Sequence, residues 1–146
     1  MNVTVLLIDY DPCSICRIRG LLSSLGIQPI VARDGVAGIA AFKRYLPDLT
    51  LIQDLVPRKH GFEVCKELKA TEDGRRSAIL LLADVRNGRR YAALATGCDD
   101  FVSKPINGRI LVAKIRKLLP RAGWPDVDAP VRRPRRRSRR RIVVVP

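Results

Sequence analysis

The chain has 146 residues, of which 47% are hydrophobic, so its length and composition fit one domain with a full core plus one further segment. Lys and Arg number 28 against 14 Asp and Glu, which makes the chain strongly basic. No apolar stretch approaches the roughly 18 uninterrupted residues of a membrane span, so we expect no membrane segment and a cytoplasmic location. The four cysteines are too few and too scattered for a disulfide scaffold, and we expect reduced thiols.

Short apolar runs alternate with longer amphipathic stretches, which is the pattern of strand and helix units around a parallel sheet. In chain order the spacing predicts a strand at Val3–Ile8, a helix at Cys13–Leu25, a strand at Gln28–Ala32, a helix at Val36–Tyr45, a strand at Leu49–Ile52, a helix at Phe62–Leu68, a loop at residues 71–77, a strand at Ala78–Ala83, a helix at Arg89–Ala95, a strand at Asp100–Val102 and a helix at Gly108–Leu119. We therefore expect an α/β domain over residues 1–120, with a doubly wound five-stranded parallel sheet and five helices.

Functional side chains of such a sheet gather at the carboxyl ends of its strands. The candidates at these ends are Asp9, Asp11, Gln53, Asp54, Leu82 and Lys104. They lie in the segments IDYDP, PDL followed by VP and HGFEVC, and TGCDDFVSKP. Through these segments residues 3–119 resemble the receiver domain of bacterial response regulators, which has a flavodoxin-like, CheY-like fold.

The resemblance implies a role in two-component or phosphorelay signal transduction. In that family an aspartate at the end of the third strand takes a phosphoryl group from a phosphohistidine, and acidic residues after the first strand hold Mg²⁺. A hydroxyl after the fourth strand and a lysine after the fifth contact the phosphoryl oxygens. Asp9 and Lys104 match this pattern, whereas Tyr10 stands in the place of the second acid, with Asp11 one residue beyond.

Two further places of the pattern are altered. Counting from Pro47 and from Pro57 places Gln53 where the phosphoacceptor should be, and counting back from Lys104 places Leu82 where the hydroxyl should be. An amide does not accept a phosphoryl group. We therefore predict an atypical receiver, or pseudo-receiver, that is not an enzyme and needs no cofactor, with Asp9 and Asp11 as the ligands if Mg²⁺ binds.

Asp54 is the alternative phosphoacceptor, one residue from the expected place. Side chains alternate along a strand, so Asp54 is expected to point away from Asp9 and Lys104 unless a bulge shifts the strand end. Lys104 is then expected to bond Asp9 or the Gln53 carbonyl, which would hold the pocket in one state. The competing interpretation is that Asp9 and Lys104 only satisfy each other's buried charge.

The predicted function is that of a stand-alone receiver protein that binds protein partners without phosphorylation. The partners implied are a histidine kinase, another regulator or an effector, and a homodimer stays open. By analogy with the family, partners dock on a switch and interaction face that includes Arg86–Tyr91, Phe101, Pro105 and Ile106–Arg109.

Residues 121–146 are rich in Arg and Pro and are predicted to form a disordered tail. Eight arginines can engage the phosphates of nucleic acid or another polyanion, although a solvated solubility tail explains them equally well: Arg132, Arg133, Arg135, Arg136, Arg137, Arg139, Arg140 and Arg141. Ile142–Val145 either adds a strand to a partner or is only an apolar end. Cys13 and Cys16 have C-x-x-C spacing but are interpreted as ordinary helix residues, and His60 as a turn residue.

Overall fold

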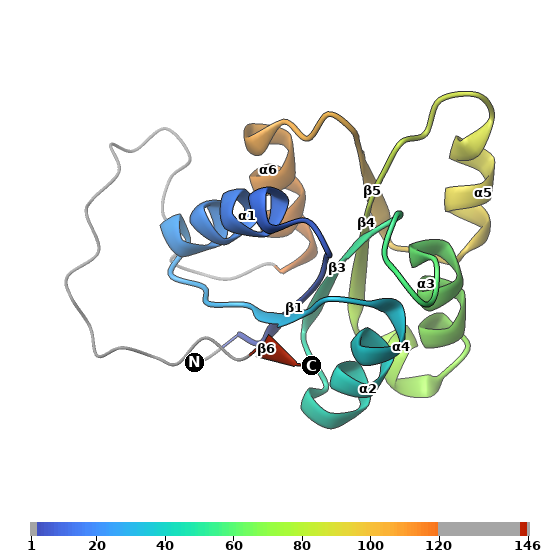
Figure 1. Cartoon of the computed structure of the whole chain (residues 1–146), viewed down its shortest axis with the longest axis horizontal. Coiled ribbons are helices and arrows are strands. Elements are labelled where there is room, and N and C mark those ends of the chain that lie inside the picture. Colours follow the sequence, from blue (N-terminus) through green and yellow to red (C-terminus); the bar gives the residue numbers. More distant parts are fainter. Residues whose placement is uncertain (1–2, 120–143, 146) are drawn as a thin grey trace.

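The computed structural model describes residues 3–119 and 144–145, which form one parallel sheet with helices on both faces (Figure 1). In chain order the elements are β1 (Val5–Ile8), α1 (Pro12–Ser24), β2 (Ile30–Ala32), α2 (Gly35–Tyr45), β3 (Leu49–Gln53), α3 (Gly61–Lys69), α4 (Glu72–Arg76), β4 (Ala78–Ala83), α5 (Arg89–Ala95), β5 (Asp100–Ser103), α6 (Gly108–Leu118) and β6 (Val144–Val145). The strand order is β5-β4-β3-β1-β2-β6, and every pairing is parallel. The predicted α/β fold is confirmed, and within the described ranges no helix is long and apolar enough to cross a bilayer.

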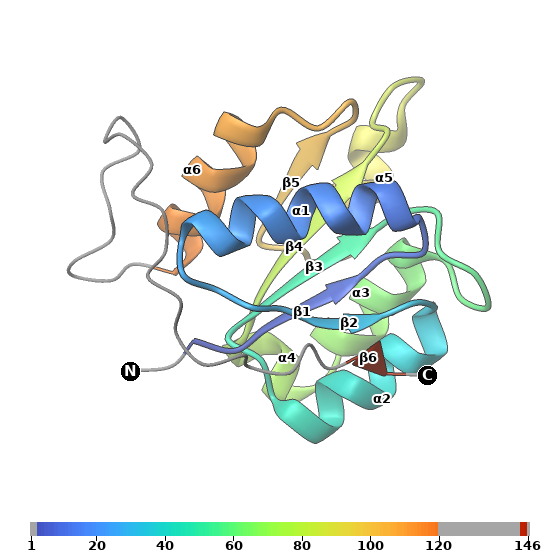
Figure 2. The same cartoon turned by 60° about the vertical axis from the view of Figure 1, so that its left-hand side comes forward.

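The sheet separates two apolar layers, because successive strand residues point to opposite faces. On one face Leu7 packs with Ile18 of α1 and Leu111 of α6. On the other face Ile8 packs with Phe42 of α2, in a layer that also includes residues of α3 and α5. Figure 2 shows α1 and α6 together on one side of the sheet and α2 and α3 on the other. Because helices cover both faces of the sheet, a polar site can form at the carboxyl ends of the strands. We call this end of the sheet its carboxyl edge.

Side-chain caps at the starts of four helices set the loops that follow the strands. Asp34 accepts a hydrogen bond from the Ala37 amide at 2.7 Å at the start of α2. Asp11, His60 and Asn107 are the N-cap residues of α1, α3 and α6, and the side chain of each accepts a hydrogen bond from a backbone amide. Each such cap contributes about 1 kcal/mol. The loops at the carboxyl edge therefore have defined backbone paths.

The structure has a sixth helix where we expected a loop. Helix α4 occupies most of residues 71–77, and Thr71 caps it by accepting from the Gly74 amide at 3.0 Å. Glu72 and Asp73 lie in its first turn and Arg75 and Arg76 in its last, which complements the helix dipole. A helix of five residues is too short to show apolar periodicity, which explains why the loop prediction was wrong.

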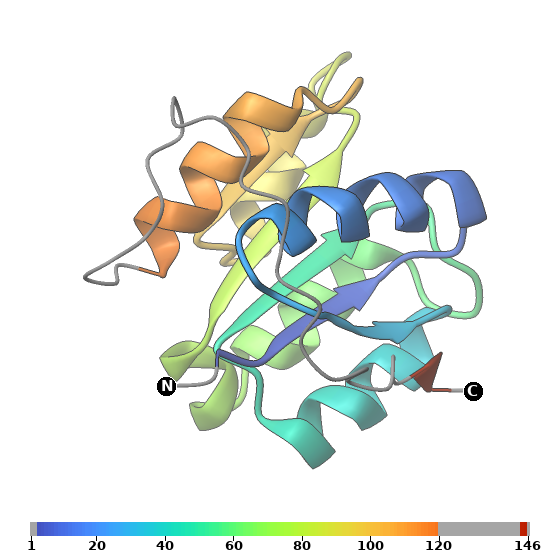
Figure 3. The ribbon, with the colours of Figure 1, turned by 90° about the vertical axis from the view of Figure 1, so that its left-hand side faces the viewer.

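The structure also has a sixth strand in the segment that we expected to be disordered. Val144 pairs with Val31 and Val145 with Ala32, so β6 extends the sheet beyond β2 (Figure 3). The prediction of disorder is therefore wrong for these two residues. The remainder of residues 120–146, including the eight arginines from Arg132 to Arg141, lies outside the described residues.

Candidate functional site

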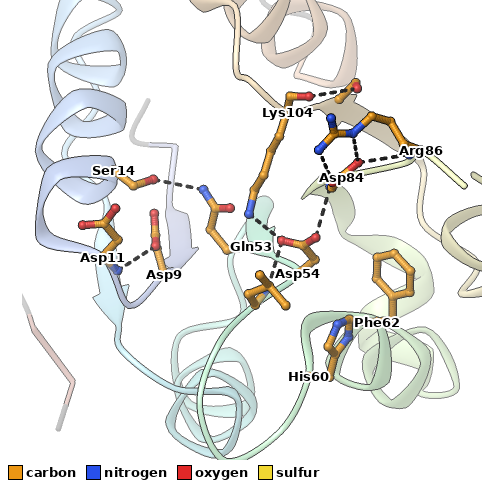
Figure 4. A network of polar contacts seen from close by, with 12 residues as sticks. Asp9, Asp11, Ser14, Gln53, Asp54, His60, Phe62, Asp84, Arg86 and Lys104 are labelled. Carbon is orange, nitrogen blue, oxygen red and sulfur yellow. Dashed lines mark hydrogen bonds and ion pairs between the residues drawn. The ribbon is translucent and has the colours of Figure 1, made fainter. Parts of the chain in front are cut away.

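The polar residues predicted from the strand ends come together at the carboxyl edge of the sheet (Figure 4). Asp9 follows β1, Gln53 ends β3 and Asp54 comes next, while Lys104 follows β5. Asp9, Gln53 and Asp54 are all at least 95% buried. The sheet order places β3 between β1 and β4, so the two residues at the end of β3 lie at the centre of the site.

Asp54 is held by three donors. Its Oδ1 accepts from Lys104 Nζ at 2.5 Å and from the Leu55 amide at 2.9 Å, and its Oδ2 accepts from the Asp84 amide at 3.1 Å. The Asp54 side chain is 2% exposed and that of Lys104 is 30% exposed. The buried carboxylate therefore has one cation and two backbone N–H groups to offset its desolvation.

This ion pair corrects two of our predictions. We expected Asp54 to point away from Lys104, and Lys104 to bond Asp9 or the Gln53 carbonyl, and both were wrong. Gln53 is the last residue of β3, so Asp54 lies in the following loop, where its carbonyl accepts from the Gly61 amide at 2.8 Å. The long, flexible lysine side chain then reaches Asp54 from β5, so no bulge is needed.

The Gln53 side chain contacts α1, whereas the Asp54 side chain contacts Lys104. Its Nε2 donates to Ser14 Oγ at 3.0 Å, in the first turns of α1. In the view of Figure 4 its side chain lies between Asp9 and the pair formed by Asp54 and Lys104. The Gln53 amide nitrogen thus links the end of β3 to α1.

The residues at this edge do not provide an ordinary Mg²⁺ site. Two buried side-chain oxygens at the edge have no hydrogen-bond partner among the described residues, Asp9 Oδ2 and Gln53 Oε1, and both are of the hard type that Mg²⁺ prefers. However, Asp11 Oδ1 is used as the cap of α1, accepting from the Cys13 amide at 3.0 Å. No group of three His, Cys, Asp or Glu side chains suited to a metal occurs in the described ranges. The other nearby carboxylates, those of Asp54 and Asp84, are bonded to Lys104 and Arg86, so the oxygens without a partner at this edge come from one carboxylate and one amide.

Leu82 takes part in the core rather than in the polar site. Its side chain is fully buried in the apolar layer under α1 and α6. Only its backbone reaches the site, where its carbonyl accepts from the Asp54 amide at 3.0 Å. Leu82 therefore positions Asp54 through the backbone and offers no side-chain donor.

The predicted switch residues lie on the face formed by β5, α5 and α6. The Phe101 ring is half-buried, with the Arg90 guanidinium 5.7 Å and the Lys114 ammonium 5.5 Å from its centroid. Pro105 is exposed, and the Ile106 carbonyl accepts from the Arg17 guanidinium at 2.6 Å. The half-buried Phe101 ring of β5 thus lies next to two cationic side chains, one from α5 and one from α6.

Sequence reasoning missed the residues that complete the network. Ser14 binds Gln53, and the Asp84 amide binds Asp54. Arg86 donates to both carboxylate oxygens of Asp84, at 2.9 and 2.8 Å, and this guanidinium holds the pKa of Asp84 well below its usual range. The position of Asp84 just after the fourth strand was the available signal, whereas nothing in the pattern pointed to Ser14.

The remaining candidate side chains have local roles. His60 caps α3, with Nδ1 accepting from the Phe62 amide at 3.1 Å, which agrees with its interpretation as a turn residue. Cys13 and Cys16 are exposed free thiols on α1. Cys65 is fully buried, and burial raises the pKa of its thiol to about 11.

Fold and site together define an α/β domain in which acidic, amide and lysine side chains meet at the carboxyl edge of a parallel sheet. A family model described as the response regulator receiver domain matches residues 5–116. Because this match covers more than half of the chain, the protein belongs to the response regulator receiver family.

Known relatives support this membership. The chain is 34% identical to the transcriptional regulatory protein CpxR of Klebsiella pneumoniae over 122 residues, which is 84% of this chain and 51% of that protein. It is 32% identical to the sensory transduction protein RegX3 of Mycobacterium tuberculosis over 86% of this chain and 54% of the relative. The chain thus spans about half the length of the curated relatives it matches.

Among solved structures, the receiver domain of a sensor histidine kinase from Pseudomonas aeruginosa is 27% identical and superimposes with a TM-score of 0.75, covering 82% of this chain and 98% of that one. That structure contains a magnesium ion coordinated in its active-site cleft. A receiver domain of a histidine kinase from Syntrophus aciditrophicus has 26% identity and a TM-score of 0.76, over 80% of this chain and 89% of that one.

Proposed function

We propose that this chain is a receiver module of two-component signalling that binds protein partners without being phosphorylated. The observation that carries the proposal is the state of Asp54, the carboxylate that Lys104 contacts. Both of its oxygens already accept hydrogen bonds, and its side chain is 2% exposed. A carboxylate oxygen must be accessible to attack a phosphoryl group, and a carboxylate with 2% exposure would have to move out of its present contacts to do so.

The position of Gln53 supports the same proposal. Phosphoryl transfer in receivers relies on a divalent ion to offset the charge that gathers between the acids and the phosphoryl group. Here Gln53 lies between Asp9 and Asp54 in Figure 4, and Tyr10 is 59% exposed in the place of the second acid. A bound charge at Asp54 would therefore have Lys104 as its main counter-ion.

Receiver domains act through histidine kinases and effectors, and we propose the same classes of partner for this chain. The surface suited to them is the outer side of α5 and its neighbour β5, where Tyr91 is 80% and Leu94 51% exposed. Phe101 lies beside this surface between two cations. Exposed aromatic side chains next to arginine are typical of protein interfaces.

One observation favours a second candidate function, that of a phosphoaccepting regulator that uses Asp54. Lys104 contacts Asp54 directly, and in the family the matching lysine neutralises the phosphoryl group on the acceptor. Lys104 is therefore already in place to neutralise a phosphoryl group on Asp54. The two candidates differ in a single measurable event, the covalent labelling of Asp54.

Intact-mass spectrometry after incubation with acetyl phosphate and Mg²⁺ tests the proposal. We expect no mass gain for the wild type or for Asp54→Asn. The positive control is an ordinary receiver domain incubated under the same conditions, which is expected to gain one phosphoryl group. A gain in the wild type that disappears in Asp54→Asn would overturn the proposal and establish Asp54 as the acceptor.

A further inference from the structure

Strand β6 lies where receiver sheets would otherwise end, along the outer edge of β2. Val144 pairs with Val31 and Val145 with Ala32, both in parallel register. Val31 is 1% exposed and Ala32 is fully buried. An uncovered edge of this kind presents unpaired N–H and C=O groups and is a template for pairing with another chain. β6 closes that edge in this structure.

Side-chain packing as well as backbone pairing holds β6 in place. Val145 is half-buried and packs against the apolar layer that contains Ala32, Ile39 and Phe42. Val144 points the other way and is 49% exposed. A strand that adds to a sheet edge typically places one side chain against the protein and the next one in solvent. The edge of β2 with the side of α2 therefore forms a site for a short apolar strand.

We propose that the outer edge of β2 is a strand-addition site and that the segment containing Val144–Val145 occupies it within the same chain. A pairing of two residues is weak between separate molecules at ordinary protein concentrations, so a free strand has to be added in large excess to form it. Tethering raises the effective concentration of such a strand to the order of millimolar, which makes the intramolecular pairing the favoured one.

The length of the connection is compatible with pairing inside one chain. A parallel neighbour needs a crossover of about a dozen residues or more, and residues 119–143 separate α6 from β6. The proposed site is also separate from the polar pocket. Asp54 follows β3 and Lys104 follows β5, and in the sheet both strands lie on the other side of β1 from β2 and β6. If Asp54 proved to be phosphorylated, the strand-addition proposal would therefore still stand.

The pairing with β6 also determines whether another chain can bind along β2. A protein that offers an extended apolar strand can pair with β2 only after β6 has left, because both would use the same backbone groups. The occupied edge therefore protects β2 from pairing with other chains.

Hydrogen exchange read by mass spectrometry on the full-length chain tests the proposal. The test variant is Val145→Asp, which places a charge against the apolar layer, and the matched control is Val144→Thr, which changes the exposed neighbour to another good strand residue. We expect the amides of residues 30–33 to exchange about tenfold faster in Val145→Asp, with β4 and β5 unchanged and the control like the wild type. Unchanged exchange at residues 30–33 in Val145→Asp would overturn the proposal.

A peptide covering residues 139–146 separates a strand site from a general weakening of the fold. Added in excess to the Val145→Asp chain, the peptide is expected to restore protection at residues 30–33. No restoration would contradict a strand-addition site. Protection that rises with wild-type concentration, together with a dimer in light scattering, would show that a second copy supplies the strand and would overturn the assignment to the same chain.

Discussion

The Asp54 carboxylate shows how a single buried charge can organise the end of a sheet. Removing a carboxylate from water is unfavourable unless a cation and hydrogen-bond donors replace the solvent. Lys104 supplies the cation, and the amides of Leu55 and Asp84 supply two donors. These contacts join the loops after β3, β4 and β5. The ion pair therefore has a structural consequence whether or not Asp54 is ever phosphorylated.

Replacing Lys104 measures this consequence. Lys104→Ala leaves Asp54 buried with only its two amide donors, and we expect the free energy of unfolding to fall by about 2 kcal/mol, a value reduced for the partial exposure of the lysine. The matched control is Lys114→Ala. Lys114 is also 30% exposed, but its partner Asp100 is 29% exposed, so we expect a loss of about 0.5 kcal/mol. Equal losses for the two variants in urea denaturation would contradict a special role for the buried pair.

Among the elements, the turn between β3 and α3 sets the direction of Asp54. Gly61 begins α3, and its amide donates to the Asp54 carbonyl at 2.8 Å. A Cβ at Gly61 would lie 2.1 Å from the Gln53 carbonyl oxygen and 2.9 Å from the Asp54 Cα. The helix and the strand end are in backbone contact here, so any side chain at Gly61 forces them apart.

Gly61→Ala is expected to destabilise the fold by about 2 kcal/mol, because the displaced backbone strains the turn and moves Asp54 away from Lys104. Gly20→Ala is the control. Gly20 lies within α1, and a methyl group added there would meet no atom within 4 Å, so alanine is expected to raise stability by up to about 1 kcal/mol through its helix propensity. Thermal unfolding of both variants checks the prediction, and a Gly61→Ala chain as stable as Gly20→Ala would refute it.

The sequence predicted the longer elements because their apolar residues repeat over several turns or fill a buried strand. Ala78–Ala83 and Arg89–Ala95 have the predicted bounds, and the carboxyl edge holds Asp9, Gln53 and Lys104 as expected. Local spacing could not give the partner of Lys104. That partner depends on where β3 stops pairing and on how far a lysine reaches, and both are properties of the assembled sheet.

The same limit applies to the two short elements. Helix α4 has five residues and depends on the Thr71 cap and on its charges rather than on an apolar stripe. Strand β6 has two residues, and its position exists only because the edge of β2 is available beside it. Elements stabilised mainly by their tertiary surroundings leave a weak local pattern, since packing overrides intrinsic preference.

At the scale of the whole molecule, the two apolar layers consist of side chains that carry no charge. Cys65 belongs to the layer beneath α2, α3 and α5, where it is fully buried and its Sγ donates to the Thr96 carbonyl at 3.9 Å. Desolvation raises the pKa of this thiol from an ordinary value of 9.0 to about 11. The folded state thus keeps Cys65 protonated at a pH at which the unfolded chain has begun to ionise it.

This difference makes global stability depend on pH in the alkaline range. A group that binds its proton more tightly in the folded state contributes stability that is fully present below its unfolded pKa, near 9, and is lost as pH rises through the folded pKa of about 11. The loss between these limits is expected to be at most about 3 kcal/mol. Cys65→Ala removes the titrating group, so the free energy of unfolding of the wild type should fall more steeply with pH than that of the variant. Urea denaturation of both proteins from about pH 8 to about pH 11 gives this comparison. Parallel curves would show that the Cys65 thiol has the same proton affinity in the folded and unfolded chains.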